Sequence, residues 1–246
     1  QPKIIDGQIA DWIGAIKEFI QQKGFSDIDD LIILGRRDRQ LKIRALVHAL
    51  AHGSKTRIHF FDETKDERVD RLLGHITPER TLVQVIVTGE NSARDIAHFG
   101  KIDNWLKEYR ERIVFTTDSL VYGFAPKHSR LVVPSVIQQN LNQVGLSPSE
   151  VLPALILGID AEEFVRGFRN LDKELAFRLA AYQYLLNQKG RIFNLIFSYS
   201  YFLRDFNSWA KQVSRLNIAE FGKGPFIDNA IGTTDQHSIL EGMLNG

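Results

Sequence analysis

Asp30-Leu-Ile-Ile-Leu-Gly35 is a short apolar run that ends in a glycine. A continuous run of this kind, without alternating polar residues, is typical of a strand buried on both faces of a parallel sheet. Residues 8–23 before it and residues 40–51 after it have apolar side chains at helical spacing. A buried strand between two amphipathic helices indicates an α/β fold.

The same alternation of strand and helix continues along the chain. Residues 57–62, 81–88 and 112–117 are expected strands, and residues 63–75 and 92–109 are expected helices. This order predicts a three-layer α/β/α arrangement, in which helices cover both faces of one parallel sheet. Ligands of such sheets bind at loops that leave the carboxyl ends of strands, which here are 35–39 and 88–92.

The pattern breaks between residues 118 and 133, where turn-forming residues predict a loop at 122–130. We therefore predict a first α/β subdomain at 1–125. Residues 126–246 are expected to form a helical connection and a partial second subdomain, which opens with a strand at 191–198. The expected helices of the connection are residues 134–146, 148–157, 160–169 and 171–189.

Composition excludes several classes of function. The chain has 246 residues and a formal net charge of +1, so no bulk electrostatic attraction favours nucleic acid or membrane. No apolar run approaches the roughly 20 residues of a membrane span. The absence of cysteine excludes disulfides, thiol catalysis and thiolate metal sites. Because the only methionine is Met243, we interpret the sequence as part of a longer chain or as a processed chain.

Gly232-Thr-Thr-Asp-Gln-His-Ser238 holds the densest group of chemically capable side chains. Apolar residues at helical spacing follow it, so we expect a loop that enters a helix, with Thr234 or Asp235 as N-cap. His237 would then lie in the first helical turn, where unpaired backbone N–H groups favour an anionic or polyhydroxylated ligand. The alternative is an ordinary first-turn histidine.

This stretch resembles the active-site signature of the phosphoglucose isomerase family. Phe197-Ser-Tyr-Ser200, Phe206-Asn-Ser-Trp-Ala-Lys-Gln-Val213 and Lys223-Gly224 also match that family's pattern. The match is specific over 197–238 and weaker back to about Asp27. It implies a sugar-isomerase (SIS) type fold and aldose–ketose isomerisation of glucose 6-phosphate and fructose 6-phosphate in glycolysis and gluconeogenesis. It further implies a sugar phosphate as ligand, a cytoplasmic location, no cofactor, and a homodimer, because the family's histidine loop completes the neighbouring subunit's site.

The resemblance also implies roles for individual residues. His237 matches the histidine that helps to open the sugar ring. An ungapped register places Leu216, which cannot accept a proton, where the family has its catalytic glutamate, whereas a gapped register places Glu220 there. The implied substrate-binding residues are Thr88, Asn91, Ser92, Gln212 and Gln236.

The chain departs from the family pattern in its two loops. Arg36-Arg-Asp-Arg39 replaces a glycine-rich turn, and it is either a solvated basic turn or a relocated anion site. Gly89 and Glu90 replace lysine and serine in the phosphate loop, and a desolvated carboxylate beside a phosphate is unfavourable. Two alternatives to a glucose 6-phosphate isomerase therefore stay open. One is a non-catalytic binding or scaffolding relative, and the other is a related enzyme for a different substrate.

Other polar residues are interpreted as structural. His48 and His52 lie four residues apart on an expected helix, but no acidic ligand pattern accompanies them, so we expect no metal site there. Asp27, Asp29 and Asp30 are interpreted as a loop and the beginning of a strand.

Overall fold

The computed structural model describes residues 2–61, 66–87, 99–117, 129–132, 146–219 and 224–245. Its main sheet has five parallel strands in the order β2-β1-β3-β4-β5. The strands are β1 (Asp30–Leu34), β2 (Arg57–Phe61), β3 (Thr81–Val87), β4 (Ile113–Thr117) and β5 (Ser129–Val132). All five residues of β1 are buried, as its continuous apolar sequence predicts.

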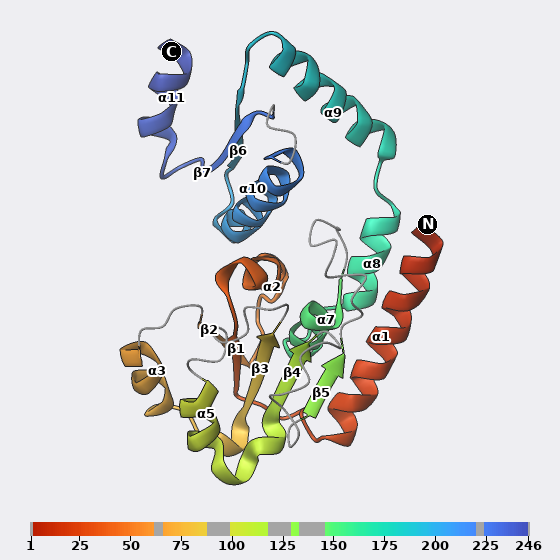
Figure 1. Ribbon diagram of the computed structural model, residues 1–246, viewed down its shortest axis with the longest axis vertical. Coiled ribbons are helices and arrows are strands. Elements are labelled where there is room, and N and C mark those ends of the chain that lie inside the picture. Colours follow the sequence, from red (N-terminus) through yellow and green to blue (C-terminus); the bar gives the residue numbers. More distant parts are fainter. Residues whose placement is uncertain are drawn as a thin grey trace.

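Helices cover both faces of this sheet (Figure 1). One core joins the sheet to α1 (Pro2–Gln22), α2 (Arg37–Leu50), α7 (Pro148–Ile156) and α8 (Ala161–Arg169). The other core joins it to α3 (Asp66–Leu73) and α5 (Phe99–Leu106). Leu31 and Ile33 face the first core whereas Ile32 and Leu34 face the second, as the two-residue repeat of a strand requires. The predicted three-layer arrangement is confirmed.

The described end of the predicted loop at 122–130 differs from the prediction. Residues Ser129–Val132 form β5, which pairs in parallel with β4. The strand has only four residues and follows a run of turn-forming residues, so it gave no recognisable apolar pattern. β5 extends the first sheet although it lies after the predicted division at residue 125. The division itself stays a prediction.

The second half of the chain carries a smaller α/β unit. After α9 (Lys173–Gln188), β6 (Phe193–Ser198) pairs in parallel with β7 (Phe226–Ile231), and α10 (Arg204–Ala219) connects the two strands. α11 (Gln236–Asn245) follows β7. Short 3-10 turns lie at η1 (Pro78–Arg80), η2 (Lys107–Arg112) and η3 (Tyr201–Leu203). α10 packs on α2 and so joins this unit to the first sheet (Figure 1).

Within the described ranges, no helix combines the length and apolar character that crossing a membrane requires.

Candidate functional site

The carboxyl ends of β1 and β3 form the point where the strand order reverses. β1 lies between β2 and β3, so the chain leaves β1 toward one edge and later returns to its other side. Gly35 follows β1 with φ of +151°, and a Cβ there would lie 3.1 Å from the backbone oxygen of Ile86. Only glycine fits this conformation and this close approach. In parallel sheets such a reversal is where ligands bind.

The turn after β1, which consists of Gly35 and Arg36 and leads into the first turn of α2, is held from both sides. Within the loop, Arg36 donates to both carboxylate oxygens of Asp38, at 3.1 and 3.0 Å. Below it, the buried Gln40 side chain donates from Nε2 to the carbonyl oxygens of Gly35 and Phe61, at 2.7 Å each. Gln40 therefore ties the end of β1 to the end of β2. Arg36 pairs inside its own turn, which agrees with the interpretation of this cluster as a basic turn.

α10 reaches the same loop from the second unit. Gln212 is half-buried on α10, and its Nε2 donates to the backbone oxygen of Asp38 at 3.4 Å. The two residues belong to separate parts of the sequence, and the α2–α10 packing brings them together. The resemblance to the phosphoglucose isomerase family assigned Gln212 to substrate binding. In the structure this residue lies at the carboxyl edge of the first sheet.

The histidine turn is built around Asp235. Its Oδ2 accepts from the backbone N–H of Ile231 at 2.8 Å, and its backbone oxygen accepts from the N–H of Ile239 and the hydroxyl of Ser238. Asp235 directly precedes α11, at the position predicted for an N-cap, but its side chain accepts from the backbone N–H of Ile231 in β7. Its carboxylate closes the turn back onto β7. His237 is the second residue of α11 and is exposed, and Gln236 beside it is half-buried.

Asn207 is a positioning residue that sequence reasoning missed. Its buried side-chain amide donates to the hydroxyl of Ser198 at 2.8 Å and to the backbone oxygen of Ala230 at 3.3 Å. It therefore fixes α10 to the carboxyl ends of both β6 and β7. The histidine turn follows β7 directly. In the sequence, the only indication of this role was that Asn207 is a polar residue inside an amphipathic helix.

Ion pairs add to the contacts of α10. Asp205 contacts Nδ1 of His48 on α2, and this hydrogen bond lowers the pKa of Asp205 below its ordinary value. Lys211 donates to Asp228 of β7 at 2.9 Å, which likewise lowers the pKa of that carboxyl. Both carboxylates are therefore charged at neutral pH. Asp205 links α10 to the first unit, and Asp228 links the small sheet to α10.

Several predicted site residues lie outside the described residues, namely Thr88, Asn91, Ser92 and Glu220. The same holds for Gly89 and Glu90, and for the side chain of Leu216. β3 ends at Val87, so the predicted phosphate loop begins directly at the carboxyl edge that also carries Gly35. α11, which carries His237, lies apart from that edge in Figure 1. The structure thus brings Gln212, but not His237, to the Gly35 loop.

Chemically, the described residues offer hydrogen-bond donors and an accessible imidazole. His237 is exposed, and an imidazole can donate or accept a hydrogen bond. In the part of the chain that the structure describes, no three metal-binding side chains cluster together. The arrangement suits proton transfer and hydrogen bonding to a polar ligand.

The known proteins to which this chain is similar include several glucose-6-phosphate isomerases. The glucose-6-phosphate isomerase of Rubrobacter xylanophilus is 29% identical over 228 residues, which cover 82% of this chain and 52% of that protein. The probable glucose-6-phosphate isomerase of Haloarcula marismortui is 26% identical over 232 residues, or 88% of this chain and 52% of that protein. No family model matches the sequence.

A solved structure confirms the fold. The glucose-6-phosphate isomerase of Chlamydia trachomatis superposes with a TM-score of 0.67 at 19% identity, over 95% of this chain and 50% of that one. This likeness confirms the predicted sugar-isomerase type of fold. This chain spans about half the length of the curated relatives it matches.

Proposed function

We propose that this chain, a diverged relative of the glucose-6-phosphate isomerases, forms part of an enzyme that interconverts glucose 6-phosphate and fructose 6-phosphate. The observation that carries the proposal is the similarity to proteins of that name over 82% and 88% of the chain. The position of Gln212 at the carboxyl edge of the first sheet supports it, because sheets of this type bind ligands there.

The proposed chemistry assigns one task to each group. His237 would exchange a proton with the ring oxygen and so open the sugar ring. A carboxylate, for which Glu220 is the candidate, would then carry a proton between C2 and C1 through an enediolate. Thr88, Asn91 and Ser92 would hold the phosphate, and Gln212 and Gln236 the hydroxyl groups. Each proton transfer of this kind contributes about 10²- to 10⁴-fold to a rate.

The separation of His237 from the Gly35 loop supports the proposed homodimer. His237 is exposed on α11, and in Figure 1 this helix lies apart from the loop of its own chain. A histidine placed in this way is accessible to a second subunit. We therefore propose that the histidine acts in the partner's site.

The test is fructose 6-phosphate turnover by the full-length gene product, in the wild type and in three variants. His237→Ala should lower kcat about 100-fold or more, because it removes a proton-transfer group. His75→Ala is the matched control, since His75 is an exposed histidine beyond α3, and it should leave turnover unchanged. Glu220→Gln should abolish turnover if the gapped register is correct, whereas full turnover would assign the base to another residue.

Three results would contradict the proposal in whole or in part. A wild-type protein without turnover, but stabilised against heat by fructose 6-phosphate, would be the non-catalytic relative. A protein with neither turnover nor stabilisation would share only the fold. Equal turnover in wild type and His237→Ala would remove His237 from the mechanism.

A further inference from the structure

An exposed tyrosine packs on the first residue of the histidine turn, residues 232–238. β6 and β7 pair in parallel with Ser198 opposite Ile231. The next residues are Tyr199 after β6 and Gly232 after β7, and these two contact one another just beyond the small sheet. The backbone N–H of Gly232 donates to the oxygen of Ser198 at 2.7 Å and holds the two segments together there. Gly232 is buried, although Tyr199 is 70% exposed.

The contact between Tyr199 and Gly232 leaves no room for a side chain at position 232. A Cβ on Gly232 would lie 2.5 Å from Cε1 and 2.8 Å from Cγ of the tyrosine ring. Carbon atoms in contact are about 3.5–4.0 Å apart, so a larger residue would displace the ring. The φ of Gly232 lies outside the left-handed region, so the obstacle to alanine is the ring and not the backbone. A ring that covers a glycine of the neighbouring strand fixes the alignment of the two strands.

The ring of Tyr199 is also held from its own strand. Phe197 and Tyr199 are two residues apart, so they lie on the same face of the extended segment. Their ring centroids are 5.4 Å apart at an interplanar angle of 68°, which is an edge-to-face contact. The position of the exposed ring is therefore set by two contacts, one with Phe197 and one with the backbone of Gly232.

The turn that begins at Gly232 determines where α11 lies. Asp235 closes this turn back onto β7 through the N–H of Ile231, and α11 begins at Gln236. Figure 1 shows α11 beyond the end of β7 and apart from the other labelled elements. The direction of α11, and with it the position of the exposed His237, therefore depends on how the turn leaves β7.

We infer that Tyr199 is a positioning residue for His237, because its ring packs on Gly232 and so fixes the path of the turn that carries the histidine. The effect on turnover rests on the proposed function, whereas the effect on the turn does not. A displacement of about 1 Å can lower a catalytic rate about 10²-fold, so a residue of this kind contributes without touching the substrate. Because the ring carbons contact Gly232, phenylalanine should replace tyrosine without loss.

The test uses the full-length gene product with Tyr199→Ala, Tyr199→Phe, Gly232→Ala and the double variant Tyr199→Ala/Gly232→Ala. Tyr201→Ala is the matched control, since Tyr201 is 66% exposed and its ring and hydroxyl contact Arg204. Backbone hydrogen exchange of residues 231–239 measures the order of the turn. The kcat and KM for fructose 6-phosphate measure the effect on His237, and urea unfolding checks that each variant is folded.

We expect the two single losses to resemble one another and not to add. Tyr199→Ala should accelerate exchange in the turn at least about tenfold, because the turn then opens more easily. It should also lower kcat at least about tenfold and change KM by less than about twofold, because proton transfer is impaired and substrate binding is not. Gly232→Ala should have the same effects, because its methyl group displaces the ring.

The double variant separates positioning from a general loss of stability. Without the ring, the methyl group of Gly232→Ala displaces nothing, so kcat should lie within about twofold of that of Tyr199→Ala. Tyr199→Phe and Tyr201→Ala should match the wild type in both exchange and kcat.

Unchanged exchange in Tyr199→Ala and Gly232→Ala would overturn the inference, whether or not the wild type converts fructose 6-phosphate. Faster exchange with an unchanged kcat would show that His237 does not depend on the turn, and would overturn the positioning role. So would additive losses in the double variant, or a loss in Tyr199→Phe as large as in Tyr199→Ala. A wild type without turnover but with the expected exchange pattern would support the role of Tyr199 in the turn and contradict only the proposed function.

Discussion

Asp30 shows how one buried charge is stabilised at the beginning of a central strand. Its side chain is only 2% exposed, yet it accepts from Nε and Nη2 of Arg57, at 2.9 and 2.7 Å, and lies 2.7 Å from Nε2 of His59. Burial by itself raises the pKa of Asp30, but the hydrogen bonds from Arg57 and His59 outweigh it and hold the pKa below the ordinary 3.8. The carboxylate is therefore ionised at neutral pH.

This cluster predicts a loss of stability in acid. Because the folded pKa of Asp30 lies below its unfolded value of 3.8, its contribution is present above that pH and is lost as the pH falls through the folded pKa. Asp30→Asn should lower the free energy of unfolding at pH 7 by about 3 kcal/mol, since Arg57 and His59 lose their charged partner. Urea unfolding at pH 7 and pH 3 measures both effects.

The exposed Asp27 is the control for this experiment. It binds Arg80 at 3.0 Å on the surface, and its Asp27→Asn variant should change stability by less than about 1 kcal/mol. If Asp30→Asn lowers the free energy of unfolding by the same amount at pH 7 and pH 3, ionisation of Asp30 does not cause the loss of stability in acid.

The partners of Asp30 could not be identified from the sequence, although its place at the beginning of a strand was predicted. The parallel register sets Asp30 opposite Arg57 and Ile32 opposite His59. A shift of one residue would turn His59 to the other face of the sheet. Apolar patterns locate strands, but they do not fix the alignment between strands from distant parts of the chain.

At the level of elements, α2 and α10 form the joint between the two α/β units. His48 in the last turn of α2 contacts Asp205 in the first turn of α10, and Arg204 and Arg44 also lower the pKa of Asp205. Beside it, the ring centroids of His52 and Phe202 are 4.2 Å apart. The sequence analysis interpreted His48 and His52 as structural residues. Their partners belong to a helix much later in the chain, so spacing could not identify them.

Asp205→Asn should weaken this joint. The carboxylate is 8% exposed, so its loss leaves His48 and the nearby arginines without a buried negative partner. We expect the free energy of unfolding to fall by about 1–3 kcal/mol, as for other buried charged hydrogen bonds. Thermal and urea unfolding measure this change.

Asp228→Asn provides the matched control for the joint. Asp228 also pairs with α10, through Lys211, but its side chain is 41% exposed and it lies on β7, whereas His48 lies on α2. Its loss should cost less than about 1 kcal/mol. If both variants lower the free energy of unfolding equally, the His48–Asp205 contact contributes no more to stability than a surface ion pair does.

The elements themselves were largely predictable, and the exceptions have physical causes. β1, β3 and β4 lie inside a sheet covered on both faces, so their apolar runs are unmistakable. β5 lies at the edge and has four residues, too few for a periodic pattern. In the candidate site, the Gly35 loop and the turn before α11 followed from glycine and capping signals. The contact of Gln212 with Asp38 did not, because it depends on how two units pack.

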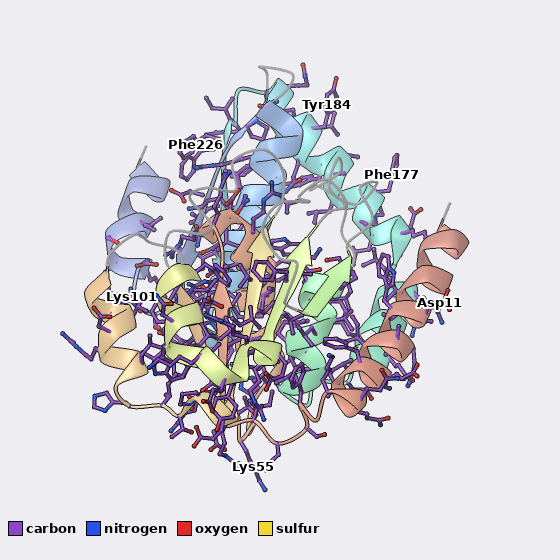
Figure 2. The ribbon with its side chains drawn as sticks, turned by 60° about the horizontal axis from the view of Figure 1, so that its bottom comes forward. Asp11, Lys55, Lys101, Phe177, Tyr184 and Phe226 are labelled. Carbon is purple, nitrogen blue, oxygen red and sulfur yellow. The ribbon has the colours of Figure 1, made fainter. Side chains whose placement is uncertain are left out.

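At the scale of the whole molecule, the second unit exposes an unusually apolar surface. Phe177 and Tyr184 of α9 are 72% and 62% exposed, and Figure 2 shows both at the margin of the molecule, with Phe226 of β7 also pointing outward. No residue of α9 is buried. Exposed apolar surface of this extent is typical of an interface.

We therefore predict that the isolated chain 1–246 associates with itself through α9. Because Phe177 and Tyr184 are seven residues apart, they lie on one face of the helix, and burying two aromatic side chains there would favour a second copy. In sedimentation experiments over a range of concentrations, Phe177→Ser/Tyr184→Ser should shift the association to at least about tenfold higher concentration, since each tenfold step needs only about 1.4 kcal/mol. Arg178→Ser, on the same helix, should leave the association unchanged. Association of the double variant at the wild-type concentration would show that the copies meet through another surface and that α9 makes no contribution to it.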